Sequence, residues 1–229
     1  MMNTVTALAA ILSVSILPAS LQIVQDDAVA VTEQAETSEN NSKLEIVEGE
    51  AREALVAELS AALSAVETAK GRFRQYNADF TEDAGAFYIR RPGRVRFEYD
   101  DPSPLLIVSD GTTVAVEDRD LSTQDRLPLG ATPLSIIIDD DIDLAEKVTI
   151  IGVERTSQYI AVTMEDKTGE NQGQLAMVFD AENYSLLQWQ TVDANGGLTI
   201  VELSGIETEV KINPRLFRIE ELGEDDERD

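Results

Sequence analysis

Residues 87–111 read FYIRRPGRVRFEYDDPSPLLIVSDG, and their pattern indicates the class of fold. Apolar and polar side chains alternate through three short runs, a period that is typical of β-strands with one buried face. The first run ends at Pro92-Gly93, a pair that favours a turn, and the second ends in a loop with Pro102 and Pro104. Strands this short, joined by such turns, predict an antiparallel sheet in which consecutive strands pair.

The same alternation continues downstream. It predicts about ten strands in all, without the helix–strand alternation or the fixed repeat of other architectures. We therefore expect a mainly β fold with some α (α+β): one strongly curved antiparallel sheet that forms an unclosed barrel, with helices on its concave side. The additional strands are expected at residues 113–117, 121–127, 147–154, 158–165, 173–180, 185–192 and 198–203.

Two segments have helical character. Residues 51–70 carry one apolar stripe at spacings of three and four, which predicts an amphipathic helix that stops near Gly71. In the second segment, Thr132 suits a helix cap and Pro133 suits the first turn, but Ile136 to Ile138 also fit a buried strand. The stripe of the first helix consists of Leu55, Leu59, Ala62, Val66, Ala69 and Phe73.

Several short motifs carry a resemblance to a known family. Arg-Pro-Gly stands at residues 91–93, Arg-Phe-Glu-Tyr-Asp-x-Pro at 96–102 and Ile-Val-Ser-Asp-Gly at 107–111. Thr-Pro-Leu at 132–134 and Asn-Pro-Arg-Leu-Phe at 213–217 follow in the same order. In these motifs the chain resembles the outer-membrane lipoprotein carrier proteins (the LolA family) over residues 51–219.

The resemblance implies a soluble periplasmic half-barrel that shields the acyl chains of lipoproteins and shuttles them from the inner to the outer membrane. It implies an inner-membrane ATP-driven extractor (LolCDE-like) as a partner and, where one is present, an outer-membrane acceptor (LolB-like). The protein is expected to act as a monomer, without a cofactor and without enzymatic activity. A carrier of another envelope lipid, or a regulatory module of the same fold that senses lipoproteins, are the alternatives.

Arg91 is the residue that we single out. By alternation it shares a face with Phe87 and Ile89, where a guanidinium is costly unless its donors are satisfied. A bent strand end that lets Arg91 reach water is the other interpretation. The family's cavity arginine falls at this Arg-Pro, so we expect its guanidinium to bind main-chain carbonyls of a lid at residues 132–139. By alternation, Arg90, Arg94 and Arg96 are expected on the outer face, where they are solvated.

The expected acyl-chain cavity is mainly aliphatic, because aromatic residues make up only 5% of the chain and include one tryptophan. The residues expected to form the cavity and its lid are Phe87, Ile89, Arg91, Val95, Phe97, Tyr99, Leu105, Ile107, Val114, Val116, Leu134 and Ile137.

Composition excludes several functions. The net charge of −26 argues against nucleic acid as a partner and against adsorption to an anionic membrane. The chain has no histidine and no cysteine, so it lacks the usual zinc ligands, thiol nucleophiles, histidine bases and the cysteine to which a lipoprotein anchor is attached. The carboxylates of residues 139–143 lack the spacing of a calcium loop, and a solvated acidic turn is the favoured interpretation.

The two ends of the chain differ from its middle. Residues 5–17 form an apolar run too short to span a bilayer comfortably, which fits a signal peptide within residues 1–30. No basic residue precedes Lys43, so a buried N-terminal helix is the alternative. Residues 31–50 are expected to be an acidic disordered linker, and residues 220–229 an acidic tail.

Overall fold

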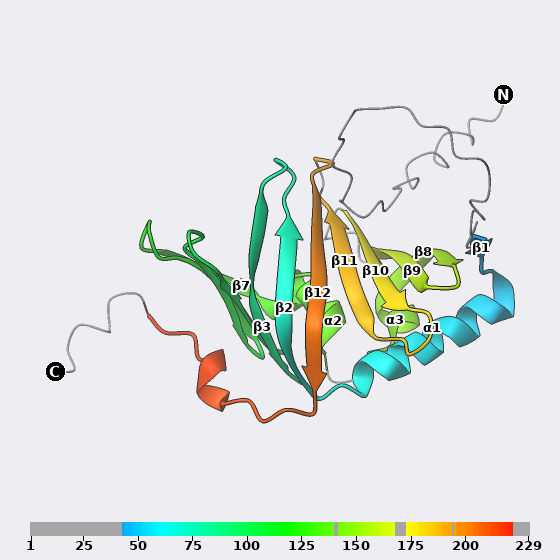
Figure 1. Ribbon diagram of the computed structural model, residues 1–229, viewed down its shortest axis with the longest axis horizontal. Helices are drawn as coiled ribbons and strands as arrows, with labels where there is room; N and C mark the ends of the chain where they lie inside the picture. Colours follow the sequence, from blue (N-terminus) through cyan, green and yellow to red (C-terminus); the bar gives the residue numbers. More distant parts are fainter. Residues whose placement is uncertain (1–42, 140–141, 168–172, 194, 222–229) are drawn as a thin grey trace, which may run out of the picture. The chain divides into compact units, whose positions relative to one another are not determined.

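The computed structural model describes residues 43–221, except 140–141, 168–172 and 194. The predicted signal peptide, most of the predicted linker and residues 222–229 lie outside the described residues. Figure 1 shows the strands side by side in one curved layer, with the helices against it.

The described strands form one antiparallel sheet of twelve, in the order β1-β8-β9-β10-β11-β12-β2-β3-β4-β5-β6-β7. The two end strands of this order, β1 and β7, do not pair with each other, so the predicted unclosed antiparallel sheet is confirmed. The strands are β1 (Glu45–Ile46), β2 (Thr68–Tyr76), β3 (Glu82–Arg90), β4 (Arg94–Tyr99), β5 (Leu105–Asp110), β6 (Thr113–Asp118), β7 (Thr123–Pro128), β8 (Val148–Arg155), β9 (Tyr159–Asp166), β10 (Gln174–Asp180), β11 (Leu186–Val192) and β12 (Leu198–Thr208).

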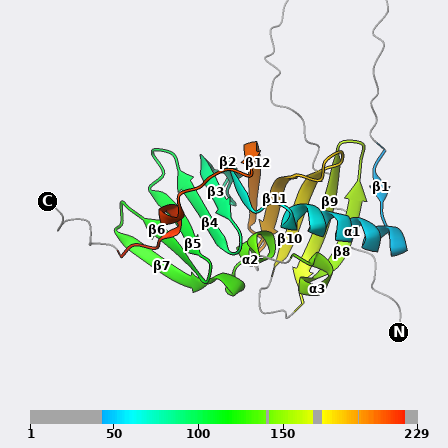
Figure 2. The same cartoon turned by 90° about the horizontal axis from the view of Figure 1, so that it is seen from below.

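The helices α1 (Gly49–Ser64), α2 (Leu134–Ile138) and α3 (Leu144–Lys147) cover one face of the sheet, as Figure 2 shows. A short 3-10 turn, η1 (Leu129–Ala131), leads from β7 into α2, and a second, η2 (Pro214–Phe217), follows β12. Ser60 joins α1 to α3, since its hydroxyl donates to Val56 O at 2.8 Å and accepts from Leu144 N at 3.3 Å.

Strand register decides which side chains face the helices. Phe87 lies opposite Phe97, which lies opposite Ile107, which lies opposite Val116. Directly opposite residues point to the same side of a sheet, so this row shares one face. The same rule continues through β2 and β12 to β11, where Trp189 lies opposite Val201. We call this helix-covered side the inner face.

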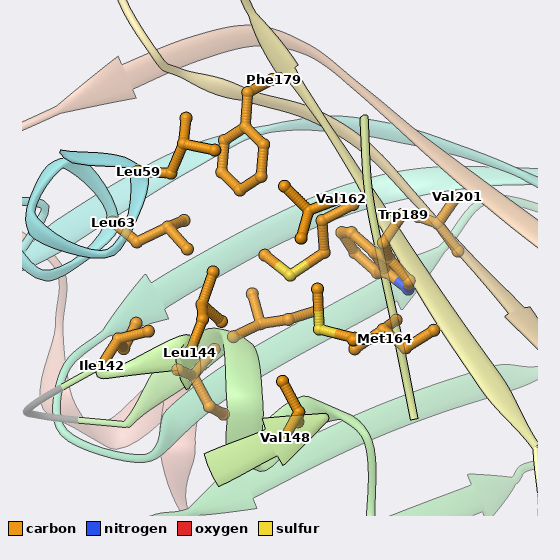
Figure 3. Close-up of a cluster of buried hydrophobic side chains, with 14 of the residues drawn as sticks. Leu59, Leu63, Ile142, Leu144, Val148, Val162, Met164, Phe179, Trp189 and Val201 are labelled. Atoms are coloured by element: carbon orange, nitrogen blue, oxygen red, sulfur yellow. The ribbon is translucent and has the colours of Figure 1, made fainter. Parts of the chain in front are cut away.

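The main core lies between the inner face and the helices. Figure 3 shows Leu59 and Leu63 of α1 and Leu144 of α3 directed toward Val162, Met164 and Phe179 of the sheet. Leu59, Leu144, Val162, Met164 and Phe179 have no exposed surface. Burial of such side chains stabilises the fold by about 1.5–3 kcal/mol each, so α1 and α3 are held firmly against the β8–β10 half of the sheet.

A second, smaller apolar cluster lies on the opposite, outer face. Leu106, Val108 and Ala115 are buried there under the C-terminal segment, together with Phe217 of η2. The segment is tied to the sheet by Arg96 Nη1, which donates to Leu216 O at 3.5 Å, and by Gln124 Nε2, which donates to Glu220 O at 2.9 Å. Arg96 is therefore on the outer face as predicted, but it is largely covered rather than solvated.

The predicted helix over residues 51–70 is wrong at its C-terminal end. Helix α1 ends at Ser64, and Ala69, Gly71 and Phe73 lie on the inner face of β2. Residues four apart in sequence share a face of a strand as well as a face of a helix. Ala69 and Phe73 have this spacing, so they fit the strand period and the helical period equally. This misassignment and the two-residue β1 explain why about ten strands were expected instead of the twelve described.

Two other expectations are resolved. Residues 134–138 are helical, which excludes the buried strand at Ile136 to Ile138, but the Thr132 hydroxyl donates to Leu129 O instead of capping α2. The folded part begins earlier than predicted, since β1 and the first residues of α1 fall within the stretch expected to be a disordered linker up to residue 50.

Candidate functional site

A cavity of about 710 Å³ opens between the η1–α2 segment and the ends of β8–β11. Its apolar wall includes Val148, Met164 and Leu175, which belong to the inner face. Polar groups are present as well, and two of the lining residues, Lys147 and Asp139, form an ion pair. The other lining residues are Gly130, Thr132, Pro133, Ser135, Ile136, Glu165, Gly173, Gln174, Thr191, Val192 and Asp193.

Arg91 follows the last residue of β3 and turns inward instead of toward water. Its Nε donates to Val66 O at 2.7 Å, and its Nη1 donates to Ile137 O at 2.8 Å and Asp139 O at 3.1 Å. The hydrogen bonds to the segment at residues 132–139 that the sequence predicts are present. The bond to Val66 O, in the connection between α1 and β2, was not predicted.

These contacts provide hydrogen-bond donors for the main-chain carbonyls at the C-terminal end of α2. The last carbonyls of a helix have no partner within it. Here Ile137 O accepts from Arg91, and Ile138 O accepts from Gly93 N at 2.8 Å. The β3–β4 turn therefore supplies, through Arg91 and Gly93, the donors that hold α2 over the inner face.

Aromatic side chains gather at the centre of the inner face, beside the cavity-bearing half of the sheet. Phe97 contacts Phe73 and Trp189 edge-on, at ring-centre distances of 5.2 and 5.9 Å. Phe73 also contacts Tyr99 at 4.9 Å. The expectation of an aliphatic inner face is therefore wrong at its centre: aromatics are few in the chain, but the fold concentrates them here.

Tyr99 keeps its hydroxyl neutral within this cluster. Burial is the main cause that raises its pKa to about 12, and the charge of Asp83 adds to the effect. The hydroxyl donates to Gln75 Oε1 at 2.7 Å, which gives this buried polar group a hydrogen-bond partner.

The structure separates the predicted site residues from the cavity. All the predicted strand residues lie on β3–β6, in the half of the sheet that α2 approaches, whereas the cavity wall comes from β8–β11. Phe87, Val95, Phe97, Tyr99, Val114 and Ile137 are buried in the core, whereas Ile89, Leu105, Ile107, Val116 and Leu134 are half-buried. None of these lines the cavity in its present form.

The cavity wall was missed because the alternation in β8–β11 resembles that of any half-buried strand. Val148, Met164 and Leu175 were recognisable as inward-facing, but no local motif distinguishes a wall that faces a cavity from one that faces a helix. The cavity forms where the ends of β8–β11 face the η1–α2 segment across a gap.

The acidic stretch after α2 has structural partners where it is described. Asp139 pairs with Lys147, and Asp143 Oδ1 caps α3 by accepting from Glu146 N at 3.0 Å. Asp140 and Asp141 lie outside the described residues. Among the residues that the structure describes, no group of three or more carboxylates is placed to hold a metal ion.

Residues 64–220 match the family described as outer membrane lipoprotein carrier protein LolA. The chain belongs to the LolA family. This agrees with the resemblance seen in the sequence motifs.

Curated members and a solved structure give the extent of the similarity. The outer-membrane lipoprotein carrier protein of Methylococcus capsulatus is 28% identical over 171 residues, which cover 70% of this chain and 80% of that protein. That of Chromobacterium violaceum is 29% identical over 175 residues, covering 73% and 84%. A LolA superfamily protein from Nitrosomonas europaea superposes with a TM-score of 0.39 at 9% identity, covering 72% of this chain and 97% of that one.

Proposed function

We propose that this LolA-family chain carries lipoproteins through the periplasm by sheltering their acyl chains between the inner face and the α2 segment. The observation that carries the proposal is the combination of an apolar inner face with a cavity of about 710 Å³ and a covering segment held by polar contacts from Arg91. The names of its curated relatives, outer-membrane lipoprotein carrier proteins, support the same role.

The energetic need for such a shelter is large. Transfer of each acyl methylene from water to an apolar environment is favourable by about 0.8 kcal/mol. The acyl chains of a lipoprotein therefore do not cross an aqueous gap unprotected. The inner face supplies apolar surface from Met164 and Leu175 at the mouth to the ring of Phe97 at its centre. Cargo that is larger than the present cavity can contact this apolar surface only when α2 moves outward.

Arg91 makes this movement reversible. Lifting α2 breaks the bonds to Ile137 O and Asp139 O, while the bond to Val66 O belongs to the connection after α1. Hydrogen bonds from a charged donor contribute about 1.5–3 kcal/mol, enough to favour the closed form without locking it. Reclosure of α2 on Arg91 then competes with cargo and favours release.

The surroundings of a carrier follow from the same proposal. The chain would be exported, with residues 1–30 removed, and would receive cargo from an ATP-driven inner-membrane extractor and deliver it to an outer-membrane acceptor. Its net charge of −26 keeps it away from anionic lipid surfaces between these steps. No helix in the described part of the chain has the length and apolarity needed to cross a bilayer.

A competition assay tests the proposal. The protein is loaded with an environment-sensitive apolar dye and titrated with a triacylated lipopeptide, with the same peptide deacylated, and with a phospholipid. We expect the acylated lipopeptide to displace the dye and the deacylated peptide to leave it bound. Equal competition by both peptides would contradict the proposal, and competition by phospholipid alone would indicate a carrier of another lipid.

A further inference from the structure

Phe80 is a large apolar residue that does not contribute to the hydrophobic core. Its side chain is 98% exposed, at the tip of the turn that joins β2 to β3. Its backbone has φ +66°, a conformation that bulky side chains rarely adopt. An asparagine or glycine would hold this turn with less strain, so the turn itself does not require a phenylalanine.

The turn that presents Phe80 is tightly braced. Asn77 N donates to Thr81 O and Phe80 N donates to Asn77 O, both at 2.9 Å. The Asn77 side chain donates to Thr81 Oγ1 at 2.9 Å and to Asp83 Oδ2 at 2.7 Å. Asp79 Oδ1 accepts from Thr81 Oγ1 at 2.6 Å. The ring of Phe80 is thus presented to solvent from a fixed backbone.

The turn stands at the mouth of the cavity. Ala78 lies against the β11–β12 turn, because a Cβ built on Gly197 would be 3.3 Å from the Cβ of Ala78. Asp193, at the start of that turn, lines the cavity, and Figure 1 shows the ends of β2–β3 and β11–β12 together at one end of the sheet. A partner that seats Phe80 would therefore be next to the opening through which cargo passes.

Charge around the tip selects the kind of partner. Exposed Asp79 lies next to Phe80, and exposed Asp193 lies on the neighbouring turn. Glu82 is also close in sequence, but it forms an ion pair with Arg74. An anionic lipid surface repels such a group. A fixed aromatic at a loop tip also suits a shaped protein pocket, where a few buried aromatic side chains carry much of the binding energy.

We propose that Phe80 is a docking residue, which inserts into an apolar pocket, rimmed by Lys or Arg, of an envelope-membrane protein that exchanges cargo with this chain. The inference rests on the proposed carrier function and adds a residue and a partner chemistry to it. It predicts that the ring is required for docking and for nothing inside the cavity.

The test compares variants for binding to envelope membranes. Phe80→Asn removes the ring but suits the left-handed backbone, and Phe80→Trp restores an aromatic. Leu121→Ala is the matched control, since Leu121 is a 71% exposed apolar residue on the β6–β7 turn. Membrane vesicles from the source bacterium, the same vesicles stripped with trypsin, and protein-free phosphatidylethanolamine/phosphatidylglycerol vesicles are the three probes, scored by co-flotation.

We expect wild type, Phe80→Trp and Leu121→Ala to bind native vesicles, and Phe80→Asn to bind about 10-fold or more weakly. Binding should fall with salt and be lost on stripped or protein-free vesicles. The inference would be overturned if Phe80→Asn and wild type bound native vesicles equally. It would also be overturned if wild type did not bind native vesicles, or bound protein-free vesicles equally well. Lipopeptide competition, run on the same variants, tests the carrier function separately: Phe80→Asn should bind lipopeptide like wild type.

Discussion

Arg91 Nη1 donates to the main-chain oxygen of Ile137 at 2.8 Å, although 46 residues separate the two in sequence. The bond joins the β3–β4 turn to the C-terminal end of α2. The same guanidinium also holds Val66 O at 2.7 Å. One side chain thus connects the sheet, the α1–β2 connection and the segment that covers the inner face.

Replacing Arg91 by leucine should separate loading from release. The variant loses the bonds that favour the closed form and adds apolar surface, so α2 should open more often and cargo should be held more firmly. The equilibrium ratio of the closed form to the open form should fall by about tenfold or more. Reconstituted transfer, which scores carrier-bound and acceptor-bound lipoprotein separately, should show normal uptake and impaired delivery.

Arg90→Leu is the control for this experiment, because Arg90 lies next to Arg91 on β3 but on the outer face, opposite Thr68 and Arg94. It should load and deliver like wild type. If Arg91→Leu also delivers normally, the hydrogen bonds to α2 have no role in release.

Filling the cavity should weaken cargo binding. Thr191 lines the cavity, whereas Thr163 of β9 lies opposite Ala176 and points to the outer face. Thr191→Trp should reduce lipopeptide affinity by about tenfold, because an indole occupies space that buried methylenes would otherwise take. Thr163→Trp should leave affinity unchanged. Dye displacement measures both, and equal affinities would show that cargo does not use this cavity.

Gly85 on β3 should not tolerate a methyl group. A Cβ there would lie 2.2 Å from Glu98 O and 2.5 Å from the Phe73 ring, so Gly85→Ala should lower the free energy of unfolding by about 1–3 kcal/mol. Gly152→Ala on β8 is the control, since nothing lies within 4 Å of the added Cβ. Urea unfolding should show a clear loss for the first and a change within about 0.5 kcal/mol for the second.

The sequence predicts much of this fold because its strands alternate cleanly and their turns carry strong signals. Val95, Phe97 and Tyr99 all face inward as expected, and Arg91 meets the α2 carbonyls as expected. It does not predict β2, because Ala69 and Phe73 fit the helical period of α1. Nor does it predict the cavity, which depends on how far α2 extends over the sheet rather than on any one strand.

Tyr99 should make the protein less stable in strong alkali. Its pKa is raised from 10.0 to about 12 in the folded protein, so the folded state keeps a proton that the unfolded state loses. Its contribution is intact below pH 10 and should be lost progressively as pH rises from about 10 to 12. The loss should reach about 2–3 kcal/mol. Tyr99→Phe should lack this part of the slope when urea midpoints are compared across that pH range, and parallel slopes would contradict the burial argument.

If lipoprotein acyl chains occupy the space between the inner face and α2, they should remain bound when the protein is isolated. Mass spectrometry of the protein purified from the periplasm of its own host tests this most directly. We expect copurifying lipoproteins whose acylated N-terminal peptides are retained, with more retained by Arg91→Leu and less by Thr191→Trp. Copurification of free phospholipid alone, or of no acylated species with any of the three proteins, would contradict it.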